Sequence, residues 1–345
     1  MYKRQIIGSY EIPILRPNYL KARVYGSWSE FDADEIGVSF IEFNGETLSF
    51  GGELIANPIV NEHYFVDLIS GLRWSDISVE NETLLSATGD AEVLVPYVGV
   101  AVGNQSQIFN THLSLTFEHN VHNISDREMI LLGRLDTDDD WTTFKWNWRN
   151  SLFLEPLLFG DGWKDMSTWQ NSTLAHELYL RFRGQHTFEN KRLIPQEEFI
   201  IGGFSSVRGY RESAVAGDGG VVVNAEYRYH VPRSLRPSSE VQQPEHRPLG
   251  KYNVRPPHVY GRPDWDLILR AFFDYGYVEV NDERPEDNSL TLMSAGVGVE
   301  LQLLTNLNLR LDWGYILNTL ERAGVKLDDA ESGDSRFHFA ATVSW

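Results

Sequence analysis

Long stretches of the chain alternate between apolar and polar residues with a period of two. From 307 to 315 the apolar residues occupy the odd positions, and the even positions are polar or glycine. The same alternation runs through 267–277, 144–148, 113–117 and 337–345. Because successive side chains of a β-strand point to opposite faces of the sheet, this period predicts strands with one apolar and one polar face.

About fourteen such segments follow one another along the chain. We expect strands near 4–15, 19–30, 45–59, 62–77, 90–103, 106–119, 141–154, 172–188, 194–203, 219–231, 264–279, 290–303, 306–318 and 335–345. Many of these segments reach ten residues or more, whereas strands of soluble proteins cluster around five or six. The lengths therefore favour strands that cross a membrane.

The polar faces separate two architectures that share this alternation. A soluble sandwich buries its apolar face, whereas a membrane barrel turns its apolar face to lipid and its polar face to a wet lumen. Here the polar faces carry full charges of both signs, such as Arg270, Asp274, Arg310 and Asp312. Aromatic residues recur near the ends of the apolar faces, where the membrane interface would lie. The predicted fold is an all-β, transmembrane antiparallel β-barrel.

Long connections separate many of the predicted strands. They cover 120–140, 155–171, 204–218, 232–263 and 319–334, and we interpret them as outer loops joined to strands whose other ends meet in short turns. The 232–263 connection holds seven of the 14 prolines, which is typical of exposed, irregular chain.

Composition narrows the class of protein further. The 345 residues contain no cysteine, which excludes disulfides, cysteine nucleophiles and thiolate metal sites. A net charge of −19 argues against nucleic acid as a partner. No pair of catalytic side chains and no metal-ligand spacing stands out, so we expect neither an enzyme nor a cofactor or metal site.

One glycine-rich connection carries an arginine, whose charge is held either by carboxylates or by solvent. Gly202 and Gly203 end an apolar run, and Arg208 follows in the 204–218 connection. Alternation turns two carboxylates on later strands, Glu226 and Asp274, toward the lumen. If the connection folds inward, Arg208 can meet both through directed hydrogen bonds. On the residues alone, a solvated and inert loop is the alternative.

The same region resembles a known family. "IPQEEFIIGGFSSVRGYRES" (194–213), "GDGGVVVNAEYRY" (217–229) and "FFDYG" (272–276) resemble the signature of the BamA/TpsB outer-membrane translocase superfamily. The resemblance implies a lumen-inserted loop whose motif arginine contacts acidic residues of the inner barrel wall. The matching positions are Val207, Arg208, Gly209 and Tyr210 in the loop, and Asp274, Glu226, Phe272 and Gly276 on the wall.

Within that superfamily the pattern is most similar to the two-partner secretion transporters of the FhaC/ShlB/HecB hemolysin-activator type. This implies export of a large, partly unfolded exoprotein across the outer membrane of a Gram-negative-type bacterium, without enzymatic chemistry. The alternative is a BamA-like insertase that assembles other barrels. A simple porin or a barrel enzyme is disfavoured, because neither needs this combination of motifs.

The chain departs from the family pattern in two ways, and its last strand carries a further motif. The family has sixteen strands and N-terminal POTRA domains, so we expect 1–345 to be the C-terminal barrel domain alone. Phe337, Phe339 and Trp345 in the last strand resemble the signal that barrel-assembly machinery reads. The partners implied are thus an exoprotein, that machinery during biogenesis, and the lipid and lipopolysaccharide of the outer membrane.

Overall fold

The protein is a single curved antiparallel sheet, seen in a computed structural model. The structure describes residues 2–15, 19–33, 43–81, 87–106, 108–160, 174–235, 263–282, 288–304, 306–322, 325–326 and 330–344. Thirteen strands are hydrogen-bonded in chain order. They are β1 (Tyr2–Leu15), β2 (Leu20–Ala33), β3 (Phe43–Val60), β4 (Tyr64–Asn81), β5 (Ala87–Gln105), β6 (Phe109–His119), β7 (Thr142–Phe153), β8 (His176–Thr187), β11 (Gly219–His230), β12 (Trp265–Glu279), β13 (Leu290–Leu303), β14 (Leu307–Ile316) and β17 (Ser335–Val343).

The remaining elements are short and lie between these strands. They are α1 (Asp126–Leu131), α2 (Glu155–Phe159), η3 (Phe188–Asn190), η4 (Pro195–Glu197), β9 (Phe199–Ile201), β10 (Val215–Gly217), η5 (Val231–Ser234), β15 (Glu321–Arg322) and β16 (Val325–Lys326). No helix in the described part of the chain is long and apolar enough to cross a membrane.

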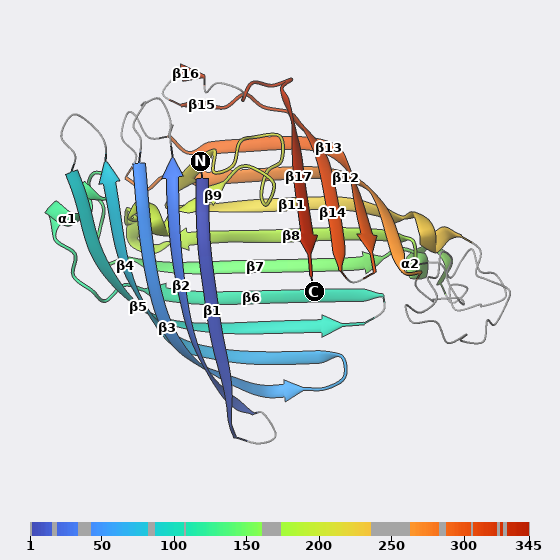
Figure 1. Ribbon diagram of the computed structural model, residues 1–345, viewed down its shortest axis with the longest axis horizontal. Coiled ribbons are helices and arrows are strands. Elements are labelled where there is room, and N and C mark those ends of the chain that lie inside the picture. Colours follow the sequence, from blue (N-terminus) through green and yellow to red (C-terminus); the bar gives the residue numbers. More distant parts are fainter. Residues whose placement is uncertain are drawn as a thin grey trace.

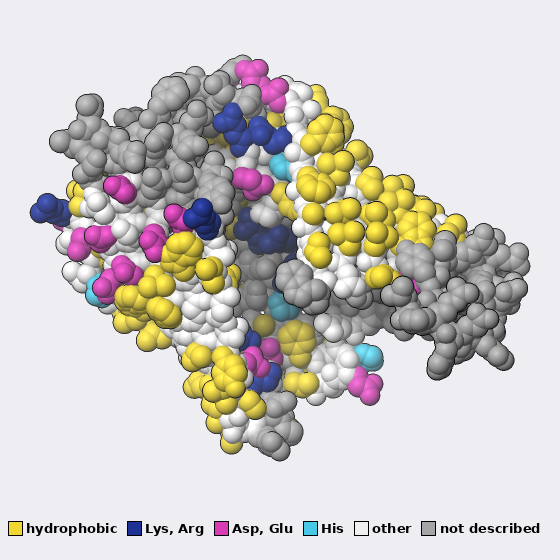
Figure 2. All heavy atoms as spheres, in the orientation of Figure 1, with side chains coloured by type: hydrophobic (Ala, Val, Ile, Leu, Met, Phe, Trp, Pro, Cys, Tyr) yellow, Lys and Arg dark blue, Asp and Glu magenta, His cyan; other side chains and the backbone are white. Residues whose placement is uncertain are grey.

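The sheet curls round until its first and last strands lie on the same side of the molecule (Figure 1). Within the described ranges β1 and β17 form no ladder with each other. Figure 2 shows a hollow on this side, with cationic and acidic side chains inside it and apolar side chains on the flanking outer surface. The barrel prediction is thereby confirmed.

Exposure follows the two faces predicted from alternation. On β17, Phe337 and Phe339 are 69% and 68% exposed on the outer face, whereas Asp274 and Asp312 are fully buried inside. Large exposed apolar residues around buried charges invert the pattern of a soluble protein and suit a wall that meets lipid.

Thirteen of the fourteen predicted segments are strands of this sheet, and the strand expected at 194–203 is wrong. That segment instead contains η4 and β9, and β9 pairs only with β10, outside the thirteen-stranded sheet. The reason is local: Gly202 and Gly203 have φ of 112° and 88°, a left-handed region that few other residues adopt, and they turn the chain back.

The long connections were expected to be outer loops at one end of the barrel, but they occur at both ends. Antiparallel strands place successive connections at alternate ends, so β8 and β11 are joined at one end, and β7–β8 and β11–β12 at the other. The connections 155–171 and 232–263 therefore start opposite the 204–218 connection, and the expectation that all three are outer loops is wrong. Residues 161–173 and 236–262 lie outside the described residues.

Candidate functional site

The segment 188–218, called here the inserted loop, joins β8 to β11 and enters the lumen. Val207 and Tyr210 are fully buried within it. They belong to one apolar cluster with residues from the inner faces of four strands, namely Val222, Val278, Leu292 and Ile316. The loop is therefore packed against the barrel wall rather than extended into solvent.

A compact turn shapes the part of the loop that carries the motif. Ser206 Oγ accepts from the Gly202 N–H at 2.7 Å and donates to the Gly202 carbonyl at 2.8 Å. The Gly203 N–H donates to the Val207 carbonyl over 3.1 Å. These bonds close the turn locally and pair the backbone groups of Gly202 and the Gly203 N–H before the chain reaches Arg208.

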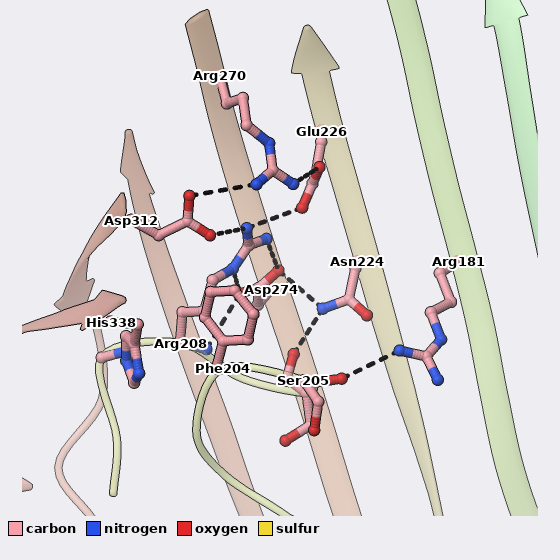
Figure 3. Close-up of polar contacts among 12 residues, drawn as sticks. Arg181, Phe204, Ser205, Arg208, Asn224, Glu226, Arg270, Asp274, Asp312 and His338 are labelled. Carbon is pink, nitrogen blue, oxygen red and sulfur yellow. Dashed lines mark hydrogen bonds and ion pairs between the residues drawn. The ribbon is translucent and has the colours of Figure 1, made fainter. Parts of the chain in front are cut away.

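Arg208 at the loop tip contacts Asp274 on β12 in a side-on arrangement (Figure 3). Arg208 Nε and Nη2 each donate over 2.7 Å, to Asp274 Oδ2 and Oδ1 respectively. The Arg208 backbone N–H also donates to Oδ2, over 3.1 Å. A planar guanidinium makes two parallel bonds to a carboxylate, which the single ammonium of lysine does not reproduce.

Two further carboxylates surround the same guanidinium. Arg208 Nη1 lies 2.7 Å from Glu226 Oε1 on β11 and 3.0 Å from Asp312 Oδ2 on β14. Arg270 contacts both acids from the other side, Glu226 through Nη2 and Asp312 through Nη1 at 3.3 Å. Burial alone would lower the pKa of Arg208, but its hydrogen bonds to Asp274 and the nearby negative charges raise it, so the guanidinium stays charged.

The aromatic and glycine positions of the wall motif make room for the loop. The Arg208 Cζ atom lies 3.4 Å from the centroid of the Phe272 ring, a cation–π contact. A Cβ at Gly296 would lie 2.4 Å from the Phe272 ring, and one at Gly276 would lie 2.8 Å from Val207 Cγ2. Glycine at these two positions therefore leaves room for the Phe272 ring and for the Val207 side chain of the loop.

The tip residues after Arg208 reach strands beyond β12. The Gly209 N–H donates to His338 Nε2 on β17 over 2.9 Å. A Cβ at Gly314 on β14 would lie 2.6 Å from Gly209 N, so backbone meets backbone here. Tyr210 Oη donates to the Asn318 carbonyl over 2.7 Å, and burial raises the pKa of Tyr210 to about 12. With the Arg208 contacts and a bond from Tyr210 Oη to the Met293 carbonyl, the tip thus contacts β11, β12, β13, β14 and β17.

The other end of the inserted loop has two anchors of its own. Asp218 is fully buried and accepts from Arg134 Nη1 at 2.6 Å and Nη2 at 2.9 Å. Glu197 lies 2.8 Å from Arg73 on β4 and 3.5 Å from Lys145 on β7. The loop therefore crosses the lumen between the β4–β7 wall and the β11–β17 wall.

The structure brings the predicted loop and wall residues together: Val207, Arg208, Gly209, Tyr210, Asp274, Glu226, Phe272 and Gly276 form one connected site. It leaves Phe337 and Phe339 on the outer face, away from this site, and Trp345 lies outside the described residues. Across those residues, no group of three or more His, Cys, Asp or Glu side chains is placed to hold a metal.

Sequence reasoning missed several wall partners. Asp312 and Arg270 were placed on the lumen side by alternation, but nothing in the pattern tied them to the loop. Asn224 Nδ2 donates to Asp274 Oδ1 over 2.8 Å and also to the Ser206 carbonyl, so it joins wall and loop. His338 also lies on the polar face of its strand in the alternating pattern, and again nothing in the pattern tied it to the loop.

Comparisons with known proteins agree with this geometry. Residues 164–248 match the family described as haemolysin secretion/activation protein ShlB/FhaC/HecB. A search of curated proteins finds no match. Three solved structures share the fold over 99% of this chain at low identity, and this chain spans about half the length of the two CdiB structures among them.

CdiB from Escherichia coli has a TM-score of 0.65 at 15% identity, with 53% of that chain covered. CdiB from Acinetobacter baumannii has a TM-score of 0.60 at 15% identity, with 50% covered. BamA from Haemophilus ducreyi lacking POTRA domains 1-3 has a TM-score of 0.57 at 11% identity, with 62% covered.

A charged lumen, an apolar outer wall and a loop inserted into the lumen define a membrane β-barrel, and the CdiB and BamA structures share this fold. Residues 164–248, which include Arg208, are similar to the ShlB/FhaC/HecB family, and the fold of the chain is similar to those of CdiB and BamA, as the motifs predicted.

Proposed function

We propose that residues 1–345 form the transmembrane barrel domain of a two-partner secretion transporter, which exports a large, partly unfolded exoprotein. The match to the ShlB/FhaC/HecB family over 164–248 supports this branch. The observation that carries the proposal is the Arg208 clasp, a buried guanidinium held by Asp274, Glu226 and Asp312 on the inner wall.

In this proposal the clasp holds the inserted loop across the lumen when no substrate is present. A polypeptide in transit needs space that the loop occupies, so the loop shifts during export. Val207 and Gly276 pack at the point where the loop leaves the wall, and Gly209 and Tyr210 set the depth of the tip. Weakening the clasp therefore changes gating more than it changes the stability of the barrel.

The proposed partners follow from the same assignment. They are the exoprotein in the lumen, outer-membrane lipid and lipopolysaccharide against the apolar outer face, and the barrel-assembly machinery that reads the last strand during biogenesis. Phe337 and Phe339, both exposed on the outer face of β17, are available to that machinery.

A secretion assay tests the proposal. Arg208→Ala and Asp274→Ala in the whole protein are expected to reduce export of the exoprotein while the barrel still reaches the outer membrane. Normal export by both variants would contradict the role of the clasp. Unchanged export together with a loss of other outer-membrane barrels would favour the insertase alternative.

A further inference from the structure

Three arginines share the lumen face of two neighbouring strands, away from the Arg208 clasp. Arg149 on β7 lies directly opposite Arg181 on β8, and Arg183 is two residues along the same face. The outer face of the same strands carries Trp146 and Phe182, whose rings contact each other. We call Arg149, Arg181 and Arg183 the arginine patch.

No carboxylate among the described residues neutralises the charges of the arginine patch. Over the residues that the structure describes, none of its three members forms an ion pair with a carboxylate. Like charges directly opposite on adjacent strands destabilise a sheet. Arg228 and Arg270 also lie opposite each other, but both contact Glu226. In the described part of the chain the arginine patch has no such shared acid, although the whole chain carries a net charge of −19.

The hydrogen bonds of the patch leave most of its donors unused. Arg181 Nη1 donates to the Ser205 carbonyl of the inserted loop over 3.1 Å, as Figure 3 shows, and Arg183 Nη2 donates to the Ile200 carbonyl over 3.2 Å. Each guanidinium has five N–H donors. The Nε atoms of Arg181 and Arg183 are buried with no partner, and the exposed Arg149 guanidinium has none among the described residues.

We propose that the arginine patch binds carboxylate side chains of an acidic polypeptide segment in the lumen. Guanidinium groups match carboxylates through paired, directed hydrogen bonds, and three of them in one row can hold successive acidic residues of an extended chain. The inserted loop touches two of the three, so a bound segment lies beside the loop. This substrate preference rests on the proposed function, because it assumes that polypeptide enters the lumen.

Binding of a short poly-glutamate peptide tests the proposal directly. The purified whole protein is reconstituted in planar bilayers, and block of the channel current is measured against peptide concentration. Arg149→Gln is the decisive variant, because its guanidinium does not hold the loop. We expect about ten-fold weaker block from Arg149→Gln, as for the loss of a charge-assisted contact. The triple variant with Arg181→Gln and Arg183→Gln should lose more.

A matched control keeps the interpretation specific. Arg23→Gln removes another lumen arginine, one that already pairs with Glu11 and Glu53, and should leave the block unchanged. Equal block in the wild type and the triple variant overturns the proposal, as does equal block by poly-glutamate and poly-lysine. Binding of inorganic phosphate that depends on the three arginines, without a block by poly-glutamate, would overturn the proposal and assign the patch to a small anion instead.

The secretion assay is read separately from the current. Loss of the block in Arg149→Gln supports the patch even if the wild type exports no exoprotein, in which case only the proposed function fails. If export depends on Arg208 but the current block is the same in the wild type and in the triple variant, only the proposed role of the arginine patch is overturned.

Discussion

Arg208 and Asp274 are joined by three hydrogen bonds, two from the guanidinium and one from the Arg208 backbone N–H. The side-chain bonds fix the orientation of the guanidinium, and the backbone bond fixes the position of the chain itself. A single carboxylate on β12 thus sets both the depth and the direction of the loop tip. Because Asp274 is fully buried, the loss of Arg208 leaves an uncompensated charge rather than a solvated one.

Arg208→Lys keeps the positive charge but removes the paired geometry. We expect export to fall by about ten-fold or more, because an ammonium cannot contact Asp274, Glu226 and Asp312 together in this arrangement. Channel current in bilayers should become larger and more variable as the loop tip detaches. Both are measured on the whole protein.

Arg23→Lys is the matched control for this change. Arg23 also contacts a carboxylate through Nε and Nη2, at 3.3 and 2.9 Å from Glu11 Oε2, but it lies on β2, between β1 and β3 in the sheet, whereas Asp274 lies on β12. Export should stay at the wild-type level. An equal loss in both variants would mean that any lumen arginine matters, and the clasp would have no special role.

Gly314→Ala tests the close approach of loop and wall without touching a charge. The added Cβ would lie 2.6 Å from Gly209 N and 2.8 Å from Arg208 C, so the tip has to move. We expect the same direction of change in current and export as for Arg208→Lys, with faster protease cleavage after Arg208 or Arg211. Gly8→Ala, where a Cβ meets nothing within 4 Å, should behave like the wild type. Unchanged cleavage in Gly314→Ala would mean that the tip is not held there.

Alternation predicted the strands and their two faces because the period of two is a property of each strand by itself. It placed Asp274 and Asp312 inside, and the structure buries both. It failed at 194–203, where an apolar stretch belongs to a short hairpin within the loop. A three-residue strand and part of a long barrel strand can have the same apolar pattern. They differ in the strands with which they pair, and the sequence pattern does not specify that pairing.

From the sequence, the face of the strand on which each wall residue lies was predictable, but most contacts between wall and loop were not. Arg208 and Asp312 are 104 residues apart, and their contact depends on how deeply the loop descends and on the register of three strands. The contact of Gly209 with Gly314 depends on the same depth, and so does the bond to His338. These contacts could therefore be identified only in the assembled barrel.

Asp218→Asn is expected to loosen the base of the inserted loop. The Asp218 carboxylate accepts from both terminal nitrogens of Arg134 and from the backbone N–H groups of Leu193 and Asn281. Hydrogen bonds to a charged group stabilise more than neutral ones, so removing the charge should cost on the order of 2 kcal/mol locally. Hydrogen exchange at the Leu193 and Asn281 amides should accelerate.

An exposed aspartate provides the comparison for that variant. Asp90→Asn on β5 changes the net charge by the same amount at a side chain that is exposed to solvent, and its exchange pattern should match the wild type. Unchanged exchange at both amides in Asp218→Asn would show that the base of the loop is held by packing alone.

A reversible cross-link decides whether the inserted loop moves during export. The chain has no cysteine, so Val207→Cys with Gly276→Cys introduces one isolated pair. A Cβ at Gly276 lies 2.8 Å from Val207 Cγ2, close enough for a disulfide to form once the valine methyl groups are gone. If polypeptide passes only when the loop leaves the wall, the oxidised protein should stop exporting, and a reductant should restore export. Each single cysteine variant should export equally with and without oxidant. Full export by the cross-linked protein would show that substrate passes with the loop in place, and the Arg208 clasp would then be a permanent strut rather than a gate.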